Sequence, residues 1–393
     1  MSVNDRSVAG PARTDAERIA DVAAGDTPNQ AVPSSMELVS PEDIIRGRPV
    51  DCDVQRYIGE TRRVIQDVLV GRDPRLLVVV GPCSIHDPHA AMVYARWLET
   101  ARKAFERRLV IVMRVYVEKP RTCTGWKGLV NDPYLDGTCR VNDGLQLARS
   151  LMYDISALGV PVATEFVNPA TAAYLADLVS WAAIGARTSE SQLHRELASA
   201  LPCPVGFKNG TTGDIEAAVN AVVAARAPQV FVGMTRSGRG GIIRTRGNPY
   251  CHVVLRGGVS PNYHSEFVHQ ASEKLRQHGA NDRILVDCSH GNAVSRSSSQ
   301  ALACEDVRRQ IDGGSSSICG VMLESNLVAG KQLLSNRDSL RFGQSITDAC
   351  LGLDDTADLL AHIAESGVST PTSSLAECFG CDREPAGAMR PPV

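Results

Sequence analysis

Short apolar runs alternate with amphipathic stretches along most of this chain. Eight of the runs are nearly continuous and rich in β-branched residues, which is typical of strands buried on both faces of a parallel sheet. They lie at residues 76–80, 109–115, 160–166, 181–187, 204–209, 252–258, 284–290 and 317–325. The stretches between them show the apolar spacing of helices that pack one face against a core. We predict helices at residues 88–107, 144–159, 189–201, 214–226, 264–279 and 298–313.

Strands that alternate with helices predict an α/β fold with an all-parallel sheet. Eight such units fit a closed (β/α)8 TIM barrel better than an open doubly wound sheet. A further helix is expected at residues 51–72, before the first strand. Residues 229–249 form too long a segment for a simple connection. We therefore expect an extra hairpin before strand six, with residues 231–234 as one arm.

The two ends of the chain lack this pattern. Residues 1–40 mix Ala, Asp, Pro, Ser and Asn and predict a flexible N-terminal segment, which leaves residues 41–366 for the barrel and its preceding helix. Residues 367–393 are rich in Ser, Thr and Pro and predict a disordered tail. Cys378 and Cys381 have CxxC spacing there, but one such pair is weak evidence for zinc, and two free thiols are the simpler interpretation.

Composition narrows the class of protein. The 41 basic and 44 acidic residues nearly balance, which argues against nucleic acid or a membrane surface as a partner. No apolar run reaches the length of a membrane span, and the first residues lack the apolar core of a signal peptide. The 12 cysteines are scattered through apolar contexts, so free thiols in a reducing cytoplasm are expected. We predict a cytoplasmic protein.

Polar side chains stand at or just beyond the end of every predicted strand. In a TIM barrel the chemistry lies at the carboxyl ends of the strands. The residues at these positions, in chain order, are Cys83, Arg114, Glu165, Arg187, Lys208, Arg256, His290 and Glu324. One of them could be a structural coincidence, and Glu165 could simply orient a neighbouring cation. Eight together predict the rim of a single pocket.

One part of this rim is cationic. Residues 114–133 (RVYVEKPRTCTGWKGLVNDP) bring Lys119, Arg121 and Lys127 close behind a buried strand. Cations in such a place need an anion, because an unpaired buried charge is costly. With Arg187 and the other rim cations they predict recognition of a small phosphate or carboxylate. The alternative is a basic loop that makes surface salt bridges.

The other part of the rim carries metal-ligand side chains. Cys83, His290 and Glu324 are joined by Asp348, which follows the eighth strand. A thiolate, an imidazole and two carboxylates suit one divalent transition metal such as Mn, Fe, Co or Zn. Each residue taken singly is more often part of a core. The hypothesis depends on their shared place at the barrel mouth.

Several long motifs in a fixed order carry a family resemblance. They are GPCSIHD (81–87), the 114–133 segment, GARTSESQLHRELAS (185–199), GFKNGT (206–211), HVVLRGG (252–258), DCSHGN (287–292), GVMLESNLVAG (320–330) and GQSITDAC (343–350). From about residue 50 to 365 the chain closely resembles the class I 3-deoxy-D-arabino-heptulosonate 7-phosphate (DAHP) synthases. The nearest subgroup contains the aromatic-regulated bacterial and yeast enzymes.

This resemblance implies a transferase that condenses phosphoenolpyruvate with erythrose 4-phosphate and water, at the entry to the shikimate pathway. It implies that phosphoenolpyruvate is held by Arg114, Lys119, Arg187, Lys208 and Arg256, with Glu165 in the same substrate site. Arg121 and Thr122 would hold the aldose phosphate. Cys83, His290, Glu324 and Asp348 would bind one divalent metal. Lys119 would be catalytic beside Cys83 and His290, as proton donor to the new hydroxyl, with a water on the metal as the alternative donor. Relatives form homodimers or homotetramers, so a homo-oligomer is expected.

Other functions remain open at this level. A sister synthase could use arabinose 5-phosphate or another aldose phosphate, although such enzymes lack the Arg121–Thr122 pair of the KPRT motif. A metal-dependent aldolase on the same fold would release no phosphate. A catalytically inactive relative would lack a ligand or a cation, and here none is missing. A paralogue feeding secondary metabolism is a further alternative.

The family's inhibitor pocket is a place where this chain departs from its relatives. The resemblance puts that pocket outside the barrel, beside residues 165–175 and 199–204. Asn168 stands where phenylalanine- and tyrosine-inhibited relatives carry an acid, Ala172 where they carry proline, and Pro202 where they carry serine. Weak sensitivity to both amino acids is therefore expected, with neutral drift as the alternative.

Overall fold

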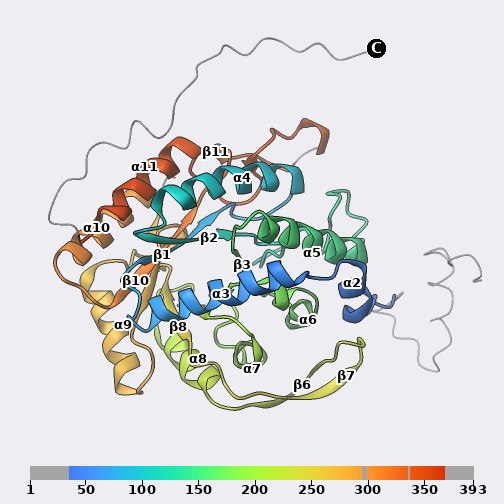
Figure 1. The fold of residues 1–393 in the computed structure, drawn as a ribbon, viewed down its shortest axis with the longest axis horizontal. Coiled ribbons are helices and arrows are strands. Elements are labelled where there is room, and N and C mark those ends of the chain that lie inside the picture. Colours follow the sequence, from blue (N-terminus) through green and yellow to red (C-terminus); the bar gives the residue numbers. More distant parts are fainter. Residues whose placement is uncertain (1–34, 294–298, 335–336, 368–393) are drawn as a thin grey trace, which may run out of the picture.

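Eight parallel strands close into a barrel in this computed structural model, which describes residues 35–293, 299–334 and 337–367 (Figure 1). The strands are β1 Leu76–Gly81, β2 Leu109–Arg114, β3 Val162–Glu165, β4 Trp181–Ile184, β5 Val205–Lys208, β8 Cys251–Leu255, β9 Ile284–Asp287 and β10 Ile318–Glu324. Each pairs with the next in this order, and β10 pairs with β1 to close the circle. All eight predicted strands and the predicted TIM barrel are confirmed, although several strands are shorter than predicted.

Helices surround this barrel on its outer face (Figure 1). The predicted ones are α4 Pro88–Phe105, α5 Val141–Ala157, α7 Gln192–Ala200, α8 Glu216–Arg226, α9 Ser265–Gln277 and α10 Ser299–Asp312. Three others were not predicted: α2 Pro41–Gly47, the short α6 Ala172–Leu175 and α11 Leu353–Ala364. The segment of α6 escaped the prediction because its helical turns are too short to show a 3.6-residue period.

The barrel interior is closed at its amino end by the predicted preceding helix, α3 Cys52–Leu69. Alternate residues of each strand face inward, so Leu77 and Val79 pack in the inner cluster while their neighbours pack against the outer helices. Ile65 and Leu69 of α3 belong to that inner cluster. The amino end is therefore filled with apolar side chains, and the carboxyl end is left for polar ones.

One glycine shows how tightly this interior is filled. A Cβ on Gly206 in β5 would lie 2.5 Å from the ring of Trp181 and 2.6 Å from Val254. Trp181 is fully buried on β4, beside β5. Only glycine leaves room for the indole at this level of the barrel.

Two small two-stranded sheets lie outside the barrel in the described part of the chain. The predicted hairpin is present as β6 Val230–Met234 and β7 Gly240–Arg244, paired antiparallel before β8. The second sheet, β11 Val328–Lys331 with β12 Gln344–Ser345, was not predicted, because its strands are very short. Its second strand, β12, ends three residues before Asp348.

The predicted division of the chain falls partly outside the described residues. Most of the 1–40 segment and nearly all of the 367–393 tail, including Cys378 and Cys381, lie there, so both predictions stay untested. Among the helices of the described ranges, none is long and apolar enough to cross a membrane.

Candidate active site at the carboxyl end of the barrel

A cavity of about 410 Å³ opens at the carboxyl ends of the strands. It is lined by every residue that the sequence assigned to substrate: Arg114, Lys119, Arg121, Thr122, Glu165, Arg187, Lys208 and Arg256. His290 and Asp348 of the metal-ligand set line it too. Their common location is thus observed, whereas the individual roles remain predictions. Lys127 is not among the lining residues, and its side chain is exposed, so the surface alternative applies to it.

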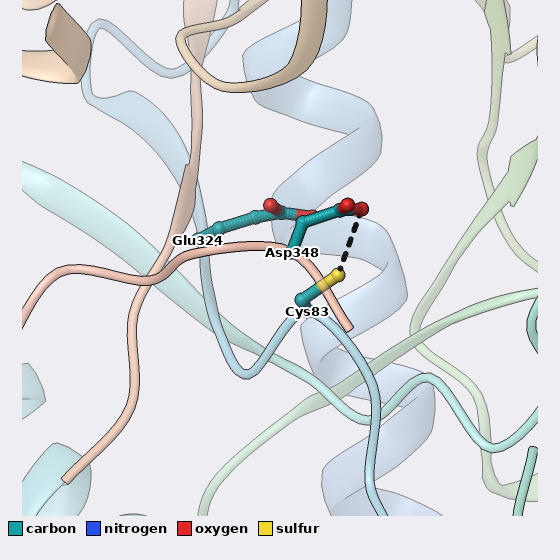
Figure 2. Close-up of side chains that lie close together, drawn as sticks. All are labelled: Cys83, Glu324 and Asp348. Carbon is teal, nitrogen blue, oxygen red and sulfur yellow. Dashed lines mark hydrogen bonds between the residues drawn. The ribbon is translucent and has the colours of Figure 1, made fainter. Parts of the chain in front are cut away.

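Three of the four expected metal ligands form a compact group. The ligand atoms of Cys83, Glu324 and Asp348 all lie within 4.8 Å of one another (Figure 2). The fourth residue, His290, stands beside this group, with Nε2 3.5 Å from Oε1 of Glu324. A soft thiol, two hard carboxylates and an imidazole at this spacing fit a divalent transition metal.

Lys119 reaches into this group from the cationic set. Its Nζ lies 2.8 Å from Cys83 Sγ and 3.0 Å from Oδ2 of Asp348. Burial alone would lower the pKa of Lys119, but Cys83, Glu324 and Asp348 outweigh it and raise that pKa. Burial also raises the pKa of the Cys83 thiol, to about 12. The ammonium therefore balances the acidic group, and a metal must displace the thiol proton when it binds.

A buried ion pair is a second contact between the cationic residues and the metal-ligand residues. Arg114 Nη2 lies 3.0 Å from Oε1 of Glu324, and both side chains are almost fully buried, at 1% and 2% exposure. The guanidinium also lies over the ring of Tyr116, 4.0 Å from its centroid. Arg114 thus holds an expected metal ligand as well as lining the cavity. Removal of either partner would leave a buried charge unpaired.

Lys208 is held between two carboxylates. Its Nζ lies 3.3 Å from Oδ2 of Asp287 and 3.8 Å from Oε2 of Glu165. Burial alone would raise the pKa of Asp287, but His290 and Lys208 lower it well below the usual range. Sequence reasoning missed Asp287. The available indication was an acid at the end of an otherwise apolar strand.

Tyr116 was missed as well. It lines the cavity, and its hydroxyl is buried without a hydrogen-bond partner in the described part of the chain. Towards the cavity mouth, Arg187 donates to Thr122 Oγ1, with Nη2 at 2.6 Å. This bond joins the loop after β4 to the loop after β2.

Glu118 fastens the loop that carries Lys119 and Arg121. Its buried carboxylate accepts hydrogen bonds from Val167 N at 3.2 Å, Asn168 N at 3.3 Å and Thr171 Oγ1 at 2.8 Å. These donors belong to the turn after β3. Burial raises the pKa of Glu118 to about 7, despite the opposing hydrogen bonds. One carboxyl thus ties together two loops of the site.

A second cavity of about 480 Å³ lies between that turn and the β6–β7 hairpin. Its lining is mostly apolar and includes Ala172, Pro202, Phe231 and Met234. Pro202 and Ala172 therefore lie where the departure from the family was expected to matter. Asn168 is not a lining residue: it is exposed, and its Oδ1 accepts from Ala170 N at 3.0 Å.

Known proteins resemble this chain in both sequence and fold. The family model described as DAHP synthetase I family matches residues 51–361. The chain belongs to the DAHP synthetase I family. A Salmonella typhimurium protein of this family, named phospho-2-dehydro-3-deoxyheptonate aldolase, Trp-sensitive, is 50% identical over 83% of this chain and 94% of its own length. An Escherichia coli protein, named Phe-sensitive, is 49% identical over 84% of this chain and 94% of its own length.

A solved family structure agrees with the barrel. The phospho-2-dehydro-3-deoxyheptonate aldolase of Francisella tularensis superposes with a TM-score of 0.84 and 45% identity, over 85% of this chain and 98% of the other. DAHP synthases use phosphoenolpyruvate and erythrose 4-phosphate and are divalent-metal enzymes in general. The expected family is therefore confirmed.

The raised pKa of Glu118 predicts a pH dependence of stability. A carboxyl whose folded pKa exceeds its ordinary value of 4.5 stabilises the fold fully below that value, and this contribution is lost as pH rises through about 7. Relative to Glu118→Gln, which stays neutral, the wild-type free energy of unfolding should fall over this interval. Urea denaturation at several pH values measures the difference. Glu60→Gln, on the exposed face of α3, is the control that should show no such trend; a flat difference for Glu118→Gln would contradict the prediction.

Proposed function

We propose that this protein is a DAHP synthase, which condenses phosphoenolpyruvate with D-erythrose 4-phosphate and water to give DAHP and phosphate. The reaction is the first step of the shikimate pathway, towards chorismate and the aromatic amino acids. The observation that carries the proposal is one cavity in which a cluster of cations and a group of metal-ligand side chains meet. The family membership of the chain supports it.

The cations suit phosphoenolpyruvate, which carries a phosphate and a carboxylate on only three carbons. Lys208 and Arg114 are buried at the floor of the cavity, while Arg187 is exposed near its mouth. Arginine grips such groups with two parallel hydrogen bonds, and lysine supplies a point charge. Arg121 and Thr122 line the same mouth and would hold the phosphate of the aldose. Erythrose 4-phosphate would thus bind with its aldehyde towards the metal-ligand group.

Cys83, His290, Glu324 and Asp348 would hold one divalent metal ion, Mn, Fe, Co or Zn. When bound, such an ion supplies Lewis-acid polarisation of the aldehyde oxygen. Lys119, whose ammonium touches two of these residues, would donate the proton to the hydroxyl that forms there. The enol carbon of phosphoenolpyruvate would bond to the aldehyde carbon, which leaves C2 cationic. Water would then add to C2 and give up a proton, and the C2–O bond would break to release phosphate. Arg114 and Lys208 would hold this carbon's substituents in place meanwhile.

The rival functions differ from this proposal in measurable ways. A sister enzyme would prefer arabinose 5-phosphate or another aldose phosphate, and a simple aldolase would release no phosphate. A secondary-metabolism paralogue would have the same chemistry. Assembly as a homodimer or homotetramer and location in the cytoplasm remain predictions.

The metal requirement gives a first test. Purified protein should release phosphate when both substrates are present, lose this activity with a chelator, and regain it with Mn or Co. Cys83→Ser should lower metal affinity and turnover, because a hydroxyl is a much poorer ligand than a thiolate. Cys52→Ser, at an exposed position at the start of α3, serves as the control. Full activity of metal-free Cys83→Ser protein would refute the metal assignment.

The two anion sites should separate by substitution. Lys208→Ala or Arg187→Ala leaves the phosphoenolpyruvate dianion partly unpaired, which should cost on the order of 2–5 kcal/mol of its binding. Arg121→Ala should instead weaken the aldose phosphate. Equilibrium binding of phosphoenolpyruvate and the KM for each substrate measure this. Equal losses for both substrates in all three variants would show that the assignment is wrong.

Weak inhibition by phenylalanine and tyrosine is a further prediction. An amino-acid pocket must satisfy the ammonium and carboxylate that it buries. Pro202 lines the second cavity and offers neither a hydroxyl nor a backbone N–H. Losing a charge-assisted contact of roughly 1.5–3 kcal/mol weakens binding at least about tenfold. Titration with phenylalanine, tyrosine and tryptophan measures the effect.

A substitution sharpens that titration. Pro202→Ser restores the hydroxyl and the N–H, so it should increase sensitivity to phenylalanine or tyrosine. Strong inhibition of the wild type by tryptophan alone would redirect the prediction towards another effector. Half-inhibition of the wild type by low micromolar phenylalanine or tyrosine would rule it out.

A further inference from the structure

Asp287, at the end of β9, contacts both sets of site residues from a fully buried position. Its Oδ1 accepts hydrogen bonds from Ser289 N at 3.0 Å and Ser289 Oγ at 2.6 Å. Its Oδ2 lies 2.9 Å from His290 Nδ1 and 3.3 Å from Lys208 Nζ. One carboxylate oxygen therefore faces an expected metal ligand and an expected phosphate ligand at the same time.

The surroundings of His290 decide which of its nitrogens carries the proton. Nδ1 lies 2.7 Å from Ser289 Oγ, and the hydroxyl proton of that serine is already donated to Asp287. Ser289 Oγ thus presents a lone pair to Nδ1, and the Asp287 carboxylate oxygen Oδ2 lies 2.9 Å from the same nitrogen, so Nδ1 is the nitrogen placed to hold the proton. The lone pair of Nε2 is left free on the side of Glu324, whose Oε1 is 3.5 Å away. This is the form in which an imidazole binds a metal.

The backbone of His290 supports the same interpretation. Its φ is 55°, in the left-handed region that residues other than glycine seldom adopt. Such a conformation persists where surrounding contacts hold it, and it is concentrated at functional sites. Asp287 and Ser289 supply contacts of this kind to the imidazole ring.

Lys208 depends on the same oxygen. Its side chain is only 4% exposed, and its other acidic neighbour, Glu165, lies farther away at 3.8 Å. Asp287 is therefore the closer acid that pairs with the ammonium where it lines the cavity. Without this partner, the buried ammonium would be balanced only by the more distant Glu165.

We propose that Asp287 is the positioning residue that links the two chemistries of the site. Through His290 it sets the ring for the metal, and through Lys208 it sets the ammonium for the phosphate of phosphoenolpyruvate. The proposal rests on the proposed function, because it presumes that both ligands bind this cavity. It predicts that one substitution weakens the binding of both the metal and phosphoenolpyruvate, although neither ligand touches the substituted side chain.

Direct binding measurements with Asp287→Asn test this link without relying on turnover. Asparagine keeps the size of the side chain but removes its charge. Calorimetric titration with Co(II) or Mn(II) should show a metal Kd raised by about 10- to 100-fold, the usual effect of losing a partner that orients a ligand. Titration with phosphoenolpyruvate alone should show a Kd raised by about tenfold or more, as for one lost charge-assisted contact. Wild-type affinity for either ligand would overturn the proposal.

Glu165→Gln is the matched control, because Glu165 faces Lys208, whereas the acids that face His290 are Asp287 and Glu324. It should change phosphoenolpyruvate binding and leave metal binding at the wild-type level. An equal loss of metal affinity would mean that any charge change disturbs the whole site, and the specific role of Asp287 would be lost. Wild-type protein that fails to bind phosphoenolpyruvate at all would instead count against the proposed function.

A second variant covers the case in which Asp287→Asn does not fold, as judged by thermal unfolding. Ser289→Ala removes the hydroxyl next to Nδ1 and one bond to Asp287, while the carboxylate stays. It should raise the metal Kd by a smaller factor than Asp287→Asn and leave phosphoenolpyruvate binding nearly unchanged. Unchanged metal affinity in this variant would remove the support for a fixed His290 tautomer and so overturn the proposal.

Discussion

Balance of buried charge is the constraint on which this site depends. Three cations at the barrel mouth are each matched by acids or a thiol: Arg114 by Glu324, Lys119 by Cys83 and Asp348, and Lys208 by Asp287 and Glu165. An unpaired charge at such depth would be costly, so each buried cation lies beside a group of opposite charge. The pairing crosses between the two sets, because each of these three cations touches an acid of the expected metal group or Asp287 beside it. An anionic substrate and a metal cation can enter such a site together while the balance is kept.

The closed barrel makes this pairing possible. Cys83 and Asp348 are separated by 265 positions, yet Sγ and Oδ2 come within 3.3 Å. Closure of β1 on β10 brings Gly81, just before Cys83, into register with Glu324. The amino end of the barrel is sealed by α3 and by the inner apolar cluster. Stability and chemistry are thus divided between the two ends, as is general for TIM barrels.

The loops above the barrel are tied to one another as well as to the strands. Glu118 joins the loop after β2 to the turn after β3, and Arg187 joins the loop after β4 to Thr122. The turn that Glu118 holds also forms one wall of the second cavity, through Pro169 and Ala170. The position of Lys119 is therefore set by contacts that extend beyond the active site itself. This arrangement gives a short physical route between the two cavities.

The sequence by itself determined the barrel, its eight strands, the hairpin before strand six and the residues that gather at one rim. The strands and the hairpin follow from apolar runs, which form a local and periodic pattern. The shared rim follows from the parallel topology, which puts all the carboxyl ends of the strands on one side. The tertiary structure alone decided which rim residues touch: Lys119 lies in the metal-ligand group, Arg114 supports Glu324, and Asp287 stands between His290 and Lys208. Such contacts depend on loop paths and side-chain directions across distant segments, which no local pattern encodes. The short turns around α6 and the β11–β12 pair were missed for a related reason, since so few residues show no period.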